Sequence, residues 1–247
     1  MNLKWRTFVA FATAVFVCVP TPTASALSFR ITSSYTQRKV SSGKFPIRSA
    51  CMMPPQSHLT RIGFKGAEGM TKESEAWAGT LEVLVETRLR SDGITVNSAA
   101  DSVSSGASND EISKVISQVE EKFNALAPLM DKKPKQIAKS AYTLGDQVGM
   151  LPCSENSDIL VFVTGVGQVL TKGRTAVTLI AGGPTEAADV FVTMADAKTG
   201  EIVGLIKTFA GFGFLENTEL EFGHRLNCQL SVMNIGSARK NPKACGD

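Results

Sequence analysis

The spacing of apolar residues predicts helices in the first half of the chain. Between residues 71 and 92, apolar positions recur at intervals of three and four, which places them on one face of a helix. Thr71 can cap this helix and Asp92-Gly93 can end it. The same spacing predicts a second helix from about residue 109 and a third over residues 134–144, with Pro128 and Pro134 bracketing a break between them.

Short apolar runs predict strands before and after these helices. In the first half they are residues 47–53, which a Pro-Pro pair stops, a short irregular run at 59–64, and residues 94–97. Four runs rich in β-branched residues follow in the second half, at 158–165, 175–181, 189–195 and 201–209. The last two form a hairpin, because Gly200 stands where a tight turn needs a positive φ. A final helix begins after Thr218, which can form a capping box with Glu221.

This order of elements, β-α-β-α-α-β-β-β-β-α, predicts the fold class. It indicates an α/β protein in which helices pack on a mixed β-sheet. We expect a single α/β domain over residues 46–235. Residues 27–45 are rich in Ser, Thr, Arg and Lys without a clear period, so we expect a flexible tail there. Residues 236–247 form a basic C-terminal tail.

The first 26 residues have the layout of a secretory signal peptide. A basic start is followed by an apolar run over residues 8–19 and by Ala24-Ser25-Ala26. We therefore expect cleavage after Ala26 and a periplasmic or secreted protein. The apolar run is shorter than the about 20 residues that span a bilayer, so we expect no transmembrane segment in the mature chain. Lipid anchoring at Cys18 is the alternative, which the large Val17 before it disfavours.

Charge and composition exclude some functions. The chain has 26 Lys and Arg residues against 23 Asp and Glu residues, and two of the basic residues lie in the leader. A near-neutral mature chain gives no reason to expect a nucleic-acid partner.

Four cysteines remain after the leader, and an even number in an oxidising compartment indicates disulfides. These candidates are Cys51, Cys153, Cys228 and Cys245. Two disulfides are the leading interpretation, and one disulfide with free thiols is the alternative. The sequence does not choose among the three pairings, although Cys228 with Cys245 would close a short loop and contribute roughly 3 kcal/mol.

Other polar clusters do not amount to a reaction centre. Glu221, His224 and Cys228 share one face of the last helix, where a metal site or a Cys-His nucleophile is one interpretation. A polar helix face carrying a disulfide cysteine is the favoured one, because no second ligand cluster or oxyanion motif is present. Gly165 and Gly167 follow a strand without the third glycine of a phosphate-binding loop. We therefore predict no catalytic residue, no metal and no cofactor.

A glycine-aromatic stretch near the end of the last strand is a candidate binding lip. Its aromatic members are Phe209, Phe212 and Phe214. As an apolar lip they would contact a ligand or partner. The favoured interpretation is that they tuck under the sheet where the chain turns into the last helix.

The segment 189–203, with its turn Asp196-x-x-Thr199-Gly200-Glu201, resembles a known envelope domain. It is similar to the periplasmic α/β domain shared by the curli-secretion lipoproteins and the amino-terminal domain of the Tol translocation protein. The strand that ends at Pro54 and the strand that begins at Asp158 fit the same pattern. The resemblance extends over residues 46–233 and implies this fold in the bacterial envelope. The short link at 169–175 differs from the long pore-forming hairpins of the secretion family, so pore formation is not carried over.

These observations favour a non-catalytic protein of the bacterial cell envelope. We expect it to bind or assemble with other proteins, either an envelope partner or further copies of itself. A periplasmic module that binds a small molecule or a glycan is the alternative. A hydrolase using Cys228 or Cys153 is the third hypothesis.

Overall fold

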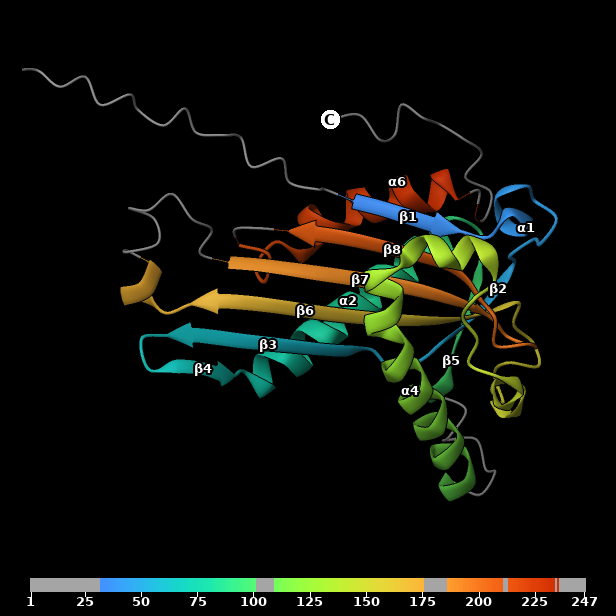
Figure 1. Ribbon diagram of the computed structural model, residues 1–247, viewed down its shortest axis with the longest axis horizontal. Coiled ribbons are helices and arrows are strands. Elements are labelled where there is room, and N and C mark those ends of the chain that lie inside the picture. The colour runs from blue at the N-terminus through green and yellow to red at the C-terminus, as the bar shows by residue number, and fades with distance from the viewer. Residues whose placement is uncertain (1–31, 101–108, 176–185, 211–212, 234, 236–247) are drawn as a thin grey trace, which may run out of the picture.

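A mixed eight-stranded sheet forms the centre of the molecule (Figure 1). The computed structural model describes residues 32–100, 109–175, 186–210, 213–233 and 235. The strands are β1 (Thr32–Thr36), β2 (Ser49–Met52), β3 (Gln56–Gly63), β4 (Gly66–Gly69), β5 (Thr95–Ser98), β6 (Ile159–Leu170), β7 (Glu186–Asp196) and β8 (Ile202–Ala210). Their order across the sheet is β1-β8-β7-β6-β2-β5, and β3 also pairs with β6 and with β4. Parallel and antiparallel pairs both occur, so the predicted mixed sheet is confirmed.

Strand β6 is the longest strand and has two different partners on one side. Its first half pairs in parallel with β2, where Ala50 faces Ile159, and its second half pairs in parallel with β3, where Gln56 faces Thr164. The Pro54-Pro55 pair separates β2 from β3, because proline cannot donate to a sheet ladder. Along its other side, β6 pairs with β7 from Ile159 to Val169.

The β7–β8 hairpin forms where the sequence predicts it. Gly200 has a φ of +69°, and a Cβ there would lie 2.5 Å from the carbonyl oxygen of Gly145. The side chain of Asp196 accepts hydrogen bonds from the backbone N–H groups of Lys198 and Thr199 at 2.9 and 3.2 Å. The hairpin therefore depends on local turn chemistry together with a close backbone approach.

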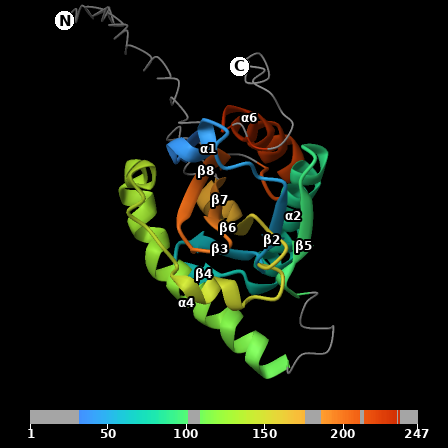
Figure 2. The same ribbon diagram turned by 90° about the vertical axis from the view of Figure 1, so that its right-hand side faces the viewer.

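Helices cover both faces of the sheet (Figure 2). They are α1 (Arg38–Ser41), α2 (Thr71–Ser91), α4 (Asn109–Lys132) and α6 (His224–Val232), with the 3-10 helices η1 (Pro134–Lys139) and η2 (Asp146–Met150) and the π-helical turn η3 (Glu219–Gly223). Helices α2 and α6 pack on one face, which we call the α2 face. Helix α4 crosses the other face, which we call the α4 face.

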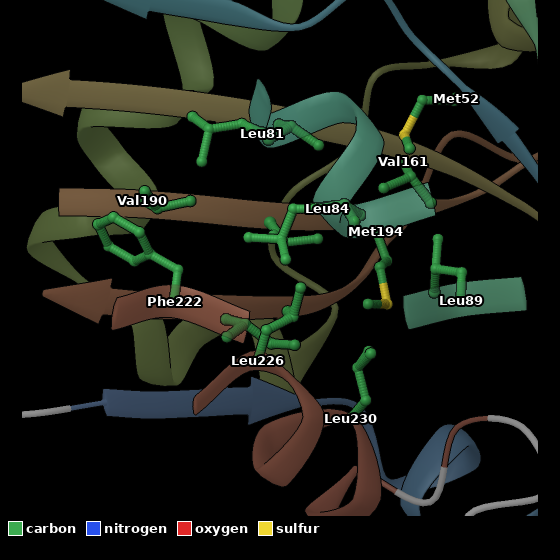
Figure 3. Packing of buried hydrophobic residues seen from close by; sticks show 14 of the residues in the cluster. Met52, Leu81, Leu84, Leu89, Val161, Val190, Met194, Phe222, Leu226 and Leu230 are labelled. Carbon is green, nitrogen blue, oxygen red and sulfur yellow. The ribbon is translucent and has the colours of Figure 1, made fainter. Parts of the chain in front are cut away.

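Each face has its own hydrophobic core. On the α2 face, Leu81 and Leu84 of α2 and Leu226 and Leu230 of α6 pack with Met194 of the sheet (Figure 3). On the α4 face, apolar residues of α4, η1 and η2 pack with the sheet. Members of this second core include Ile112, Val119, Phe123, Ile137, Val148, Leu160, Phe162 and Leu205.

The N-terminal region differs from the prediction of a flexible tail over residues 27–45. Strand β1 pairs antiparallel with β8, with Tyr35 facing Leu205, and α1 follows it. Gln37 is 3% exposed, and its side chain donates a hydrogen bond to the carbonyl oxygen of Ile202 at 2.8 Å. Pairing with β8 supplies the order that the polar composition of the segment does not indicate.

Two helix boundaries also differ from the prediction. Pro128 lies inside α4, which continues to Lys132, because the buried Met130 and the sheet hold its last turn. Tyr142 supports that end, since its hydroxyl donates toward the carbonyl oxygen of Leu129 at 3.1 Å. The helix expected over 134–144 is the short 3-10 helix η1, which ends where Ser140 adopts a left-handed φ of 56°.

Neither predicted threonine cap is present. Thr71 is the first residue of α2, the preceding Met70 occupies the cap position, and no side chain caps this end. Thr218 instead donates its hydroxyl to the carbonyl oxygen of Phe214 at 2.8 Å.

Several predictions fall on segments outside the described residues. They are the leader over 1–26, the strand over 175–181 apart from Thr175, which ends a helical turn, and the C-terminal tail. Among the helices that the structure describes, none has the length and apolar character needed to cross a bilayer.

Candidate functional site

One of the three candidate lip residues lies in the core and not on the surface. Phe214 is fully buried, and its ring packs edge-on against Trp77 with centroids 5.1 Å apart. Phe209 lies in β8, and Phe212 is outside the described residues. Phe214 therefore belongs to the core of the α2 face, in agreement with the favoured interpretation of this stretch.

Cys51 and Cys153 form a disulfide, with their Cα atoms 5.6 Å apart. The bond joins β2 to the segment after η2 across 102 residues of sequence. Cys228 is also disulfide-bonded, and its predicted partner Cys245 is outside the described residues.

The last helix does not provide a reaction centre. His224 is exposed, whereas Cys228 is 7% exposed and already bonded, so the two do not form a nucleophile pair. The described part of the chain also contains no group of three His, Cys, Asp or Glu residues placed to hold a metal ion.

A hollow on the α4 face is the best candidate for a binding site. It lies between the C-terminal half of α4 and strands β6, β7 and β8, and its volume is about 280 Å³. Most of the wall is apolar. We call it the α4 hollow, and its lining residues are Phe123, Ala127, Pro128, Met130, Asp131, Thr164, Val166, Asp189, Phe191, Thr193 and Leu205.

Two carboxylates share one ammonium group at this site. The Lys207 Nζ lies 2.8 Å from an Asp131 oxygen and 3.8 Å from an Asp189 oxygen. It also lies 4.9 Å from the centroid of the Phe191 ring, within the range of a cation–π contact. One positive charge against two negative charges leaves this group of side chains acidic.

Partial burial raises the pKa of Asp189 above its ordinary value. The charge of Lys207 lowers this pKa and the charge of Asp131 raises it further. A cation brought beside Asp189 would stabilise its ionised form, so the carboxylate favours a positively charged ligand group.

Thr164 adds an unsatisfied polar group to the lining. Its Oγ1 is buried and has no hydrogen-bond partner among the described residues. A buried hydroxyl without a partner costs free energy, which a ligand with a donor or acceptor at this point would recover. A mostly apolar wall with a few polar groups is the composition of a ligand-binding pocket.

The sequence alone does not predict this site. Its residues come from α4 and three strands, and no local motif joins them. The available signal was the alternation in β7 and β8, where Asp189 and Lys207 stand among apolar residues. Charged residues at alternate strand positions indicate a face that is not fully covered.

Comparison with known proteins gives little further information. No family model matches the chain, and no curated protein matches it. A solved structure with a similar arrangement is the PelC dodecamer from Paraburkholderia phytofirmans, which is 10% identical; the match covers 83% of this chain and 96% of that one, with a TM-score of 0.36. A point variant of that PelC dodecamer gives 11% identity, 82% and 96% coverage, and a TM-score of 0.35. Similarity this distant assigns no function to the chain.

Proposed function

We propose that the protein is an exported, non-catalytic binding protein of the bacterial cell envelope, and that a protein partner binds at the α4 hollow. The leader pattern supports export, and the Cys51–Cys153 disulfide fits an oxidising compartment. The observation that carries the proposal is the hollow itself, which is an apolar concavity lined by two carboxylates.

An exposed apolar side chain in the hollow favours a protein over a free ion or a small polar ligand. Val166 of β6 lies in the lining and is 44% exposed. Apolar side chains around a concavity supply the contact area that protein interfaces use. We infer that the partner inserts an apolar side chain into the hollow and places a Lys or Arg beside Asp131 and Asp189.

A photo-crosslinking residue at position 166 tests this proposal in intact cells. We expect a specific crosslinked adduct from position 166. Position 83 is the control, because Val83 is also exposed, at 63%, but lies on the outer surface of α2. We expect no adduct from position 83. The mass of the adduct distinguishes an envelope partner from a second copy of this chain. Monomer alone from position 166, or the same adducts from both positions, would contradict the proposal.

A small molecule or glycan as ligand is the second candidate. The buried Thr164 hydroxyl favours it, since a ligand polar group at that point would complete the hydrogen bonding. Native mass spectrometry of the exported protein would show a bound ligand of fixed mass, lost in a Phe191→Asp variant. A spectrum of bare protein from freshly prepared periplasm would count against this candidate.

A further inference from the structure

Phe64 is the most exposed of the large apolar side chains that the structure describes, at 73%. It lies in the turn between β3 and β4, at one end of the sheet (Figure 1). The helical turn 172–175, which follows β6, lies at the same end. We call residues 63–66 together with residues 172–175 the tip.

Specific contacts hold the two parts of the tip together. The backbone N–H of Thr171 donates to the carbonyl oxygen of Ile62 at 3.0 Å, and the Arg174 guanidinium donates to that of Gly63 at 3.0 Å. A Cβ at Gly173 would lie 3.2 Å from Cε2 of Phe64, so the ring rests against this glycine. The exposed ring is therefore held in place, which lowers the entropy that a binding event must remove.

Basic residues surround this ring. Lys65 and Lys172 are exposed, and Arg174 is half-buried. None of the three forms an ion pair with any carboxylate within the described ranges. The neighbouring Arg61 is paired with Glu73 at 3.5 Å, and Glu68 lies opposite Arg61 in the β3–β4 register. The tip thus carries a local positive excess on a chain whose total charge is near neutral.

We propose that the tip is a contact site for an anionic lipid surface. An aromatic side chain presented among Lys and Arg residues is the chemistry of peripheral membrane binding, because the ring enters the headgroup region while the cations attract anionic lipids. One ring and three cations give a weak and reversible contact. The proposal is independent of the α4 hollow, since the two sites share no residue.

Sedimentation with lipid vesicles tests the proposal on the exported, processed protein. We expect binding to phosphatidylcholine vesicles that contain phosphatidylglycerol, little binding to phosphatidylcholine alone, and loss of binding at high salt. Phe64→Ser should weaken binding about tenfold, as expected for an apolar ring that leaves water. Each of Lys65→Gln and Lys172→Gln should weaken it roughly fivefold. The matched control is Val83→Ser, which removes a similarly exposed apolar side chain on α2.

A Phe64→Trp variant gives a readout that does not depend on loss of binding. Its fluorescence should shift to the blue with anionic vesicles, whereas the buried Trp77 should not respond. Equal binding by the wild type, Phe64→Ser and Val83→Ser would overturn the proposal. Binding would then come from a part of the chain that all three proteins share, such as the N-terminus. Absence of binding to anionic vesicles, or equal binding to neutral ones, would overturn it as well.

Discussion

The two halves of β6 meet different surroundings. Residues 159–163 are all buried, whereas in residues 164–170 buried positions alternate with partly or fully exposed ones. Both halves have a hydrogen-bonded neighbour on each side. On the α4 face, Leu160 and Phe162 belong to the core, whereas Val166 is 44% exposed and lines the hollow. The difference therefore arises from what covers the sheet and not from strand pairing.

On the α2 face, the second half of β6 has glycine at two positions that pack against aromatic rings. Gly165 and Gly167 turn toward the α2 face, where a Cβ at position 165 would lie 2.4 Å from Cζ3 of Trp77 and one at 167 would lie 2.8 Å from Cζ of Phe214. These glycines admit the aromatic rings that close this core. The same strand is thus fully buried at one end and, at the other, open on the α4 face, where we propose that a partner binds.

Truncating an aromatic ring in the buried half should give the largest effect. Phe162 stacks on Phe123 of α4 with centroids 4.3 Å apart. We expect Phe162→Ala to lower the free energy of unfolding by about 3–5 kcal/mol, measured by urea denaturation. Val166→Ala, on the same face of the open half, should change it by less than about 0.5 kcal/mol. Similar losses in the two variants would show that α4 does not create the difference between the halves.

Removal of the disulfide should come next in size. Cys51 lies in β2, which pairs with the first half of β6 and not with its second half, and the bond closes a loop of 102 residues. The double variant Cys51→Ala/Cys153→Ala should lose about 2–5 kcal/mol of stability. Reducing agent should lower the urea midpoint of the wild type and leave that of a variant also lacking Cys228 unaffected. A wild-type midpoint equal to that of the double variant would contradict a structural role for the bond.

A methyl group at Gly165 should destabilise the protein less. Its Cβ would meet the ring of Trp77 and, at 2.8 Å, Cδ1 of Leu81, so side chains must shift. We expect Gly165→Ala to cost about 1–3 kcal/mol in the free energy of unfolding. The control is Gly69→Ala, because a Cβ there has no atom within 4 Å. Equal losses would show that packing on the α2 face does not require a glycine in β6.

The sequence predicted the elements whose signals are local. Helix α2 follows from its apolar spacing, and the β7–β8 hairpin follows from the turn ending at Gly200. Strand β1 was missed because its order comes from pairing with β8, a partner far along the chain. Pro128 was misleading because tertiary packing keeps α4 helical beyond a residue that normally ends a helix.

The candidate site was harder to predict for the same reason. Burial was the favoured interpretation of the stretch at 209–214, and Phe214 is buried, but its contact with Trp77 of α2 could not be predicted from the local sequence. The α4 hollow depends on where α4 stops covering the sheet, and no single segment encodes that position. Lys207 and Asp131, at 2.8 Å, are neighbours only after folding.

The smallest expected effects on the free energy of unfolding come from two carboxylates of the β7–β8 hairpin, Asp189 and Glu201. The two effects have opposite signs. Asp189 lies opposite Val166 of the open half, and burial raises its pKa. Glu201 lies at the closed end; its partial burial acts to raise its pKa, but hydrogen bonds from Lys39, Ser140 and Gln37 and the charge of Lys39 lower it overall. The Lys39 Nζ lies 2.6 Å from Glu201.

A raised pKa means that the folded protein holds the Asp189 proton more tightly than the unfolded chain does. Stability is therefore lost as the pH rises from the ordinary Asp value of about 3.9 through the raised folded value. Asp189→Asn should be more stable than the wild type at neutral pH, and this gain should vanish in acid. Because about a third of the side chain is exposed, solvent screening should keep the gain below about 1 kcal/mol.

Glu201→Gln should behave in the opposite way. Its lowered pKa contributes stability that is present above the ordinary Glu value of about 4.3 and is lost as the pH falls through the lowered folded value. This variant should therefore be less stable than the wild type at neutral pH, and the two should converge in acid. Urea midpoints of the wild type and both variants across this pH range measure the difference. If both variants changed the urea midpoint in the same direction at neutral pH, Asp189 and Glu201 would not have the opposite effects on stability that their pKa shifts predict.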